Sequence, residues 1–370
     1  MKRSSIIIGV ILMAFVALLA SCNLGPRTVR VGVAGPMTGP NAKQGTDFLN
    51  GVKLAADEWN AKGGVLGKQI EVIAEDDRSD PKEAVMVANK LVNQNVAGVI
   101  GHYESSCSIP ASAIYYEAGV VQITPSSTNP DLTLREKRAT IFRSCGRDDQ
   151  QGAMAAQFVR DVLKKKRVAI IDDKTTYGQG LAREFQKNLG EGVTVTAYEN
   201  LQRGDKDFAS ILTKIKPGNP EAVYFGGYYT EAGLLVTQMR RLGMKAAFIS
   251  GDATIDQEFL NLAGKDAEGT YLSYGPEVSQ LESARNFVKS YTEKFGPLGP
   301  YSLYAYDAAN VLLQGIAAAK TTEGAKVAAA IHGMTFSGAR GELSFDQNGD
   351  LKNIPYVMWV VKNGKFETVK

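Results

Sequence analysis

The chain has 370 residues, of which 44% are hydrophobic and 22% are charged, a composition typical of a globular protein that is long enough for two domains. Its 42 Lys and Arg residues nearly balance 39 Asp and Glu residues, and the two signs are interspersed along the sequence. Nucleic-acid-binding proteins gather basic side chains on one face, so we expect no nucleic acid partner.

Residues 1–22 have the layout of a secretory signal peptide. MKRSS supplies positive charge, and the apolar run IIIGVILMAFVALLA follows it. This run is about fifteen residues long, against the roughly twenty that a membrane-spanning helix needs. Leu19-Ala20-Ser21-Cys22 resembles the lipobox, in which the cysteine is acylated. We expect an exported protein, anchored by lipid at Cys22 on the periplasmic or cell-surface face of the cytoplasmic membrane.

From Thr28 onward, short apolar runs alternate with helical patterns. Strands are predicted in TVRVGVAG (28–35), QIEVIAED (69–76), VAGVIG and VVQITP. One helix is predicted to carry Phe48 and Trp59 on one face and to stop at Gly63-Gly64, and another is predicted from Pro81. Strands that alternate with helices are typical of a parallel sheet with both faces covered.

The same alternation starts again after Arg143. Strands are predicted in RVAIID, VTVTAYE, AVYFGG, AAFISG and EGTYLSY, with helices from Gly178, near Phe208 and from Glu231. A helix over 302–319 and strands near ARGELSF and IPYVMWVV come last. The predicted fold is therefore α/β, with two doubly wound parallel-sheet lobes joined by a multi-crossover hinge. Lobe 1 comprises residues 28–145 plus 275–355, and lobe 2 comprises 146–274 plus 356–370.

Several motifs for cofactors and metals are absent or incomplete. No GxGxxG or GxxxxGK[ST] sequence occurs, which disfavours nucleotide binding. DQNGD (346–350) lacks the spacing of a calcium loop and is better explained as a hairpin turn. His102 and His332 are the only histidines and have no metal-ligand spacing. We expect no metal and no cofactor.

The stretch GHYESSCSIPAS (101–112) places a histidine close to candidate nucleophiles. A hydrolase would use His102 as the base for Ser105, Ser106 or Cys107, but the surrounding residues do not form the GxSxG turn. A buried histidine at a strand end is the favoured alternative, so we do not expect an enzyme. Cys107 and Cys145 could form a disulfide or remain two buried thiols, and both alternatives stay open.

Polar and aromatic residues follow the predicted strands, where ligands bind in open α/β sheets. Ser105 and Thr128, with free backbone amides, would hold a carboxylate, although such residues also cap helices. In the second half, Tyr177 and Tyr228 follow strands, and Asp252 could pair with an ammonium group or cap the next helix. Donors on one lobe and a carboxylate with aromatics on the other suit a zwitterion.

Nine motifs in order carry a resemblance to a known family: GPMTGPNAKQG, NAKGGVLGK, DDRSDPKEAV, VIGHYESS, ITPSSTNPDLT, FRSCGRDDQQG, DKTTYGQGLA, YFGGYYTEAG and GELSFDQNGDLK. Together they resemble the type I periplasmic binding proteins of branched-chain amino acid ABC importers, the leucine/isoleucine/valine-binding group, over residues 28–370. The resemblance implies a monomer that closes on an amino acid in the cleft and then docks on a permease.

The resemblance also implies roles for individual residues. Ser105 and Thr128 match residues that hold the ligand carboxylate, and the Ser126 carbonyl matches an acceptor for the ammonium group. Asp252 matches its acidic partner, and Tyr177 and Tyr228 match aromatic residues that close over the ligand.

The chain departs from the family pattern at several positions. Gln44 stands where leucine binders commonly have tyrosine, and Tyr103 replaces a smaller apolar residue, so the side-chain pocket differs. Glu104 and Ser79 stand where enteric members have a disulfide. The leading hypothesis is a receptor for a neutral, branched-chain or related amino acid, and the alternative is a ligand-sensing receptor for an amide, urea-like or aromatic acid ligand.

Overall fold

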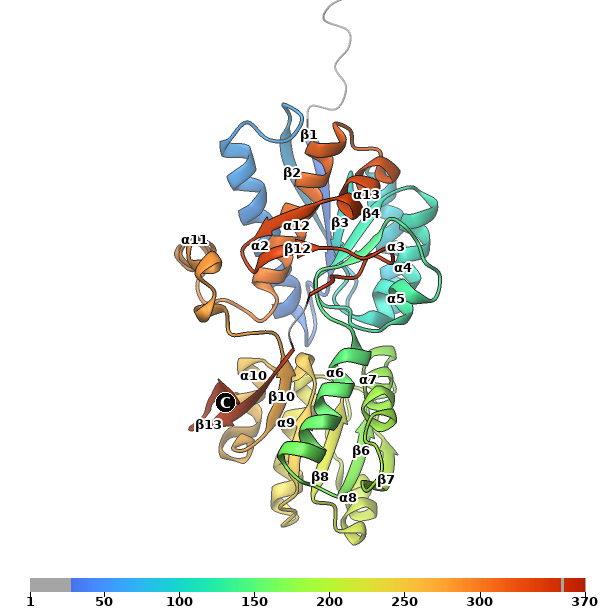
Figure 1. The fold of residues 1–370 in the computed structure, drawn as a ribbon, viewed down its shortest axis with the longest axis vertical. Helices are drawn as coiled ribbons and strands as arrows, with labels where there is room; N and C mark the ends of the chain where they lie inside the picture. The colour runs from blue at the N-terminus through green and yellow to red at the C-terminus, as the bar shows by residue number, and fades with distance from the viewer. Residues whose placement is uncertain (1–27, 354–355, 370) are drawn as a thin grey trace, which may run out of the picture.

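The computed structural model describes residues 28–353 and 356–369, which are drawn in colour in Figure 1. The predicted signal peptide and Cys22 lie outside the described residues. Within the described ranges, no helix has both the length and the apolar character that crossing a membrane requires.

The first sheet is parallel and has five strands in the order β2-β1-β3-β4-β5. Its strands are β1 (Thr28–Gly35), β2 (Gln69–Asp76), β3 (Gly98–Gly101), β4 (Val121–Thr124) and β5 (Ile141–Arg143). Two helices that pack on each other, α2 (Ala42–Ala61) and α12 (Ser302–Ala319), cover one part of it, and α3 (Pro81–Asn93) and α4 (Ser105–Glu117) form a second such pair. The sheet therefore has the helical cover that its apolar strands predict.

The second sheet has seven strands in the order β14-β13-β10-β9-β8-β6-β7. Its parallel strands are β6 (Arg167–Asp172), β7 (Thr194–Asn200), β8 (Ala222–Gly226), β9 (Ala247–Ser250) and β10 (Tyr271–Tyr274). Strand β13 (Val357–Lys362) pairs antiparallel with β10, and β14 (Lys365–Thr368) pairs antiparallel with β13. The helices of this half are α6 (Asp148–Gln157), α7 (Thr176–Lys187), α8 (Ala209–Ile215), α9 (Tyr229–Arg241) and α10 (Gln257–Ala263).

The parallel strands of both sheets follow the same spatial order, which confirms the prediction of two similar halves and of an α/β fold. In Figure 1 the sheets lie one above the other. The chain passes from the first sheet to the second after β5, returns after β10 to form α12, and crosses again before β13. Three crossings of this kind are what the predicted multi-crossover hinge requires. The residue boundaries of the two lobes stay a prediction.

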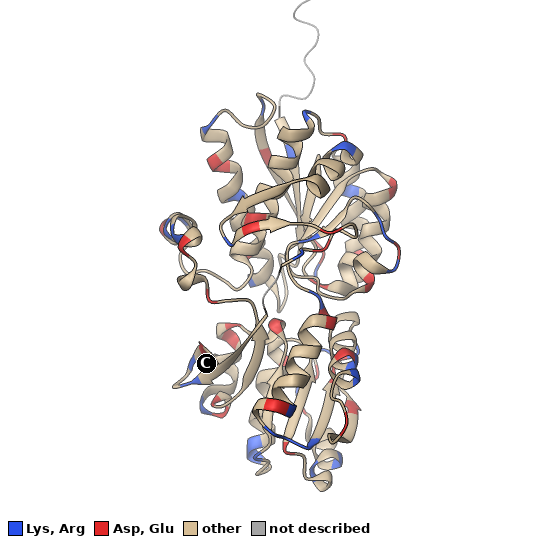
Figure 2. Ribbon diagram, viewed as in Figure 1, with Lys and Arg blue, Asp and Glu red and all other residues tan. Residues whose placement is uncertain are grey.

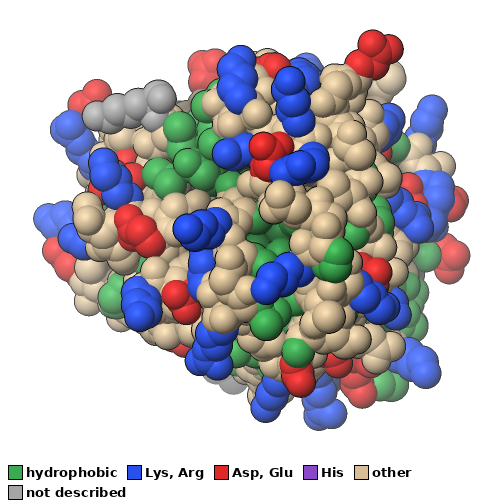
Figure 3. Space-filling view, turned by 90° about the horizontal axis from the view of Figure 1, so that it is seen from below, with side chains coloured by type: hydrophobic (Ala, Val, Ile, Leu, Met, Phe, Trp, Pro, Cys, Tyr) green, Lys and Arg blue, Asp and Glu red, His purple; other side chains and the backbone are tan. Residues whose placement is uncertain are grey.

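The remaining elements are short or lie near the crossings. They are α5 (Asp131–Leu134), the π-helical turn Phe158–Val162 that continues α6, α11 (Arg285–Phe295), α13 (Gly324–Gly333), and the two-stranded sheet of β11 (Thr335–Gly338) and β12 (Gly341–Ser344). DQNGD forms a tight turn after β12, in which the Gly349 N–H donates to the Asp346 carbonyl, as predicted. Lys and Arg are interspersed with Asp and Glu over both halves in Figure 2 and on the face shown in Figure 3.

Helix α6 was not predicted, because its buried face is small and polar instead of apolar. Asp148, Gln151 and Gly152 lie on that face. A Cβ atom on Gly152 would lie 2.7 Å from the backbone nitrogen of Phe185 in α7, so the glycine allows the two helices to approach closely. Helices α7 and α9 each begin two residues before the predicted start, at Thr176 and Tyr229.

Candidate functional site

Two neighbouring strand ends of the first sheet meet through hydrogen bonds. Ser105 is the first residue of α4, and its Oγ accepts a bond of 3.3 Å from the backbone N–H of Asn129, beyond the end of β4. The Ser126 hydroxyl donates to the Tyr103 carbonyl at 2.7 Å. The segments after β3 and β4 therefore form one polar surface.

This polar surface has unused donors. Thr128 is buried, and its hydroxyl lies beside the Asp148 carboxyl without a well-formed hydrogen bond to any described residue. The N–H groups in the first turn of a helix lack intrahelical acceptors, and Ser105 begins such a turn in α4. A hydroxyl and free amides beside a helix N-terminus favour an anionic group such as a carboxylate.

Asp252, after β9, lies at the centre of a second polar cluster. Its Oδ1 accepts hydrogen bonds of 2.9 Å from the Tyr177 hydroxyl and 2.9 Å from the Gln151 side-chain amide. Its Oδ2 accepts a bond of 3.1 Å from the Tyr301 hydroxyl. The nearby helix α10 is capped by Asp256 instead, whose carboxylate accepts from the Glu258 N–H. The alternative in which Asp252 caps this helix is therefore wrong.

Asp252 has a second buried carboxylate near it. Burial raises the pKa of Asp252, and its three hydrogen bonds oppose that rise. Burial also raises the pKa of Asp148, at the start of α6, well above its usual range, and repulsion from Asp252 adds to the effect. The neighbouring Thr128 hydroxyl opposes this rise in the pKa of Asp148. Because a nearby cation favours the ionised form of a carboxyl group, an ammonium group placed here would lower both pKa values and pair with Asp252.

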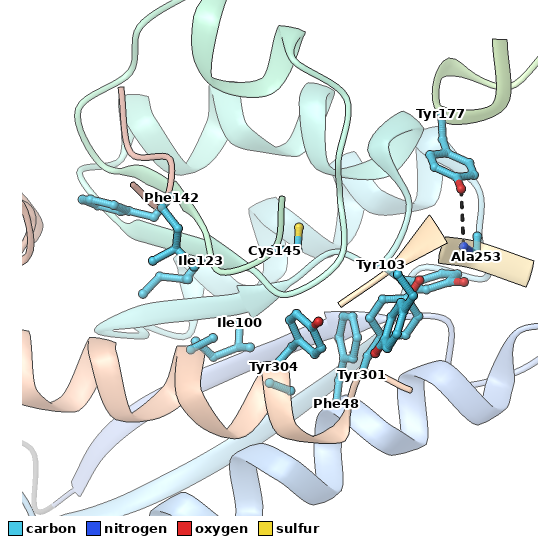
Figure 4. Close-up of a cluster of buried hydrophobic side chains, with 14 of the residues drawn as sticks. Phe48, Ile100, Tyr103, Ile123, Phe142, Cys145, Tyr177, Ala253, Tyr301 and Tyr304 are labelled. Atoms are coloured by element: carbon cyan, nitrogen blue, oxygen red, sulfur yellow. Dashed lines mark hydrogen bonds between the residues drawn. The ribbon is translucent and has the colours of Figure 1, made fainter. Parts of the chain in front are cut away.

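Aromatic rings from both halves of the chain pack together, and Phe48, Tyr103 and Tyr301 of this group are labelled in Figure 4. The Tyr103 ring lies 5.4 Å from that of Tyr301, 6.0 Å from that of Phe48 and 6.0 Å from that of Tyr228. Tyr228 in turn lies 5.3 Å from Tyr177. The Tyr103 hydroxyl is buried without a hydrogen-bond partner in the described part of the chain.

Gln44 joins the two halves at the edge of this cluster. It lies one helical turn before Phe48 on α2 and is 1% exposed. Its Nε2 donates a hydrogen bond of 3.0 Å to Asp256 Oδ2, beyond β9. Nearby, the Asn129 side chain donates to the Thr176 carbonyl at 2.8 Å. The structure thus brings all eight predicted ligand-binding residues to facing ends of the two sheets.

The space between these residues is small in this structure. A cavity of about 10 Å³ lies beside Asp252 and is lined also by Tyr274, Tyr301, Tyr304 and Tyr356. Pockets for small molecules usually have volumes of about 300 Å³ or more. The cavity beside Asp252 is therefore too small for an amino acid in this conformation, whereas a cavity of about 300 Å³ lies on the other side of the tyrosine cluster, against Tyr228 and Arg203.

The family model described as periplasmic binding protein matches residues 28–365. This chain belongs to the periplasmic binding protein family. A Leu/Ile/Val-binding protein homolog of Brucella suis is 41% identical over 338 residues, which cover 91% of each chain.

Solved structures of this family have the same fold. The leucine binding protein LivK of Thermotoga maritima superimposes with a TM-score of 0.85 at 31% identity, over 92% of this chain and 98% of that one. The branched-chain amino acid transporter substrate binding protein LivJ of Streptococcus pneumoniae, in complex with isoleucine, has a TM-score of 0.85 at 31% identity, over 92% and 99%. The predicted family and fold are confirmed.

In this periplasmic binding protein, His102 is a buried histidine with partners on both ring nitrogens. Nδ1 lies 2.7 Å from Asp77 Oδ2, and Nε2 lies 3.1 Å from the Tyr115 hydroxyl. These contacts match the alternative in which the histidine has a structural role. Burial raises the pKa of Cys107 far above its usual range, which disfavours a thiolate nucleophile.

The alternative of a disulfide between Cys107 and Cys145 is wrong in this periplasmic binding protein, because both residues are free, buried thiols. Cys107 lies in the first turn of α4 and Cys145 follows β5, where its Sγ lies 3.6 Å from the Ser127 carbonyl. No group of acidic, histidine and cysteine side chains suited to a metal ion occurs in residues 28–353 and 356–369.

Several residues of the site were not predicted from the sequence of this periplasmic binding protein. Gln151 and Asp148 lie in FRSCGRDDQQG, a motif that signalled the family but carried no assigned role. Tyr301 directly precedes α12, and only the return of the chain across the hinge brings it to Asp252. No pattern in the sequence marked Tyr301 as part of the site.

Proposed function

We propose that this periplasmic binding protein is the extracytoplasmic solute-binding component of an ABC importer and binds a branched-chain or related neutral amino acid between its two lobes. The observation that supports this most strongly is that two polar surfaces of complementary character, one from each half of the chain, face each other. The first has unused donors at Ser105 and Thr128, and the second has the buried carboxylate of Asp252.

In the proposed complex the ligand carboxylate lies at Ser105 and Thr128, and the ammonium group lies between the Ser126 carbonyl and Asp252. Tyr177 and Tyr228 cover the ligand from the second sheet, and Tyr103 and Gln44 border the side-chain end. Charge-assisted hydrogen bonds of this kind are stronger than neutral ones, so both ends of the zwitterion contribute to affinity. Binding forms and breaks no covalent bond, and we infer no catalytic activity.

The names of similar proteins support the choice of ligand. The relative from Brucella suis is named for leucine, isoleucine and valine, and the Streptococcus pneumoniae structure contains isoleucine. These names favour an aliphatic amino acid over the amide, urea-like or aromatic acid of the alternative hypothesis.

The transport cycle follows from the hinge. Opening of the lobes admits the amino acid, closure buries it, and the closed form docks on the membrane permease. In this proposal the protein acts as a monomer with lobes at 28–145 plus 275–355 and 146–274 plus 356–370. A lipid on Cys22 keeps it at the periplasmic or cell-surface face of the cytoplasmic membrane.

Isothermal titration calorimetry against the twenty amino acids tests the proposed function. We expect isoleucine, leucine or valine to bind with a dissociation constant near 1 μM, which corresponds to about −8 kcal/mol. If none of the twenty binds, the assignment to amino acids is wrong. Binding of an amide, urea-like or aromatic acid in the same assay would then support the alternative.

A further inference from the structure

Glu104 and Arg203 form an ion pair between the two halves of the chain. Glu104 directly precedes α4, and Arg203 lies between β7 and α8 in the other half. Arg203 Nη1 donates to Glu104 Oε2 at 2.6 Å. The Glu104 side chain is 1% exposed and that of Arg203 is 25% exposed, so water screens this pair less than a surface pair.

Each member of the pair has a further contact that fixes its position. The Asn41 side chain donates to Glu104 Oε1 at 2.8 Å. The Arg203 guanidinium carbon lies 4.3 Å from the centre of the Tyr228 ring, a cation–π geometry. Burial lowers the pKa of Arg203, but Glu104, Tyr228 and Glu231 together raise it more, so the guanidinium stays charged.

Each member of the pair adjoins a residue of the proposed binding site. Glu104 is adjacent in the chain to Ser105, where we place the ligand carboxylate, and Arg203 lies on Tyr228, which we place over the ligand. A buried carboxylate at position 104 without a partner would repel the ligand carboxylate. The guanidinium of Arg203 cancels this charge only while the two halves are in contact.

We propose that Arg203 is a positioning residue, which neutralises Glu104 and holds Tyr228 when the lobes close, and thereby sets how long the amino acid stays bound. This inference rests on the proposed function. Breaking a buried ion pair by removing one partner is costly because the other charge remains uncompensated, whereas removing both charges is tolerated better. We therefore expect removal of Arg203 alone to weaken ligand binding more than removal of Arg203 and Glu104 together.

A double-mutant cycle with isoleucine tests the proposal. We expect Arg203→Met to weaken binding at least about thirtyfold, Glu104→Gln to weaken it less than about fivefold, and the double variant to recover to within about fivefold of wild type. In stopped-flow measurements the loss in Arg203→Met should appear in koff, with kon changed less than about threefold.

Two controls separate positioning from folding. Arg160→Met removes a partly exposed arginine of the same half, which pairs with Asp161, and should leave isoleucine binding unchanged. Thermal unfolding without ligand shows whether each variant is folded. Arg203→Lys keeps the charge but loses the planar contact with Tyr228, and should bind with intermediate affinity.

The outcomes are distinct. Recovery in the double variant supports the proposal, because a merely structural arginine would not be rescued by Glu104→Gln. The inference is wrong if Arg203→Met is folded and binds as wild type does, or if the double variant binds no better than Arg203→Met. In either case, isoleucine binding by wild type leaves the proposed function intact. If wild type binds leucine or valine but not isoleucine, the cycle is run with that amino acid, and if it binds none of the twenty amino acids, both proposals fail.

Discussion

Tyr301 donates a hydrogen bond of 3.1 Å to Asp252 Oδ2, although the two residues belong to different halves of the chain. Tyr301 directly precedes α12, which packs on the first sheet, and Asp252 follows β9 of the second sheet. The carboxylate that we assign to the ligand ammonium is therefore stabilised by donors from both halves. Closure of the lobes and ionisation of Asp252 are linked.

Tyr301→Phe should make isoleucine binding more sensitive to acid. Burial raises the pKa of Asp252 and the bond from Tyr301 lowers it, so removal of the hydroxyl raises it further. Because only the ionised carboxylate pairs with an ammonium, affinity should fall as pH falls, and it should fall at a higher pH in the variant. Calorimetry between pH 5 and 8 measures this. Tyr116→Phe, at an exposed tyrosine, is the control, and superimposable profiles would refute the link.

Asp252→Asn should weaken isoleucine binding at least tenfold, because it removes a charged hydrogen-bond partner worth roughly 1.5 to 3 kcal/mol. Titration calorimetry at pH 7.5 gives the affinity. Asp57→Asn, at an exposed aspartate on α2, is the matched control and should bind as wild type. An unchanged affinity in Asp252→Asn would mean that this aspartate only organises Tyr177, Gln151 and Tyr301.

Tyr103→Leu should shift the preference of the site toward larger aliphatic amino acids. The Tyr103 ring contacts Phe48, Tyr301 and Tyr228, so a leucine leaves more room between these rings. The affinity for leucine relative to alanine should rise by about tenfold, the effect expected of one or two methylene groups in an apolar pocket. Competition titrations give this ratio. A constant ratio would place Tyr103 away from the ligand side chain.

Asp173→Asn should reduce the pH dependence of stability in the ligand-free protein. Burial raises the pKa of Asp173 from 3.8 to about 7. A folded-state pKa above the unfolded value means that the folded state binds the proton more tightly, so stability falls as pH rises from about 4 to about 7. The variant keeps an acceptor for the Thr175 N–H but has no charge to bury. Melting temperatures of both proteins should diverge across this window, and parallel curves would contradict the shift.

Asp350→Ala should destabilise the protein by about 3 to 5 kcal/mol, because it leaves a buried guanidinium without its partner. Asp350 accepts from Arg143 at 2.5 Å and from Arg147 at 2.8 Å, and Arg143 is 0% exposed. Urea unfolding gives the free energy. Asp149→Ala removes a more exposed partner of Arg147 and should cost less than about 1 kcal/mol. Equal losses in the two variants would contradict a special role for the buried pair.

The sequence predicted best what depends on local pattern. The bounds of β1, α3 and α12 agree with the apolar periodicity, and the strand ends that carry Ser105, Thr128 and Asp252 follow directly from it. Once strands are parallel, their carboxyl ends share an edge, so residues such as Ser105 and Thr128 are neighbours by topology.

The sequence predicted least what depends on contact between the halves. Helix α6 packs so closely on α7 that Gly152 and polar side chains replace the apolar face that signals a helix. Tyr301 and Arg203 reach the site from segments whose positions depend on the hinge. Their local sequence resembles that of any helix start or surface loop. Hydrophobic periodicity predicts local secondary structure and does not indicate which distant residues a side chain will contact.

The last crossing of the chain has a consequence for synthesis. Strands β13 and β14 are formed by residues 357–362 and 365–368, and β13 pairs with the edge of β10. Until residues 357–362 have been synthesised, the backbone groups on that edge of β10 have no partner strand, and an open edge can pair with other chains. The first sheet likewise lacks part of its helical cover until α12 has been synthesised. Each half therefore needs a segment that follows a later crossing of the hinge, α12 for the first sheet and β13 for the second, before its sheet is covered or paired as in the structure.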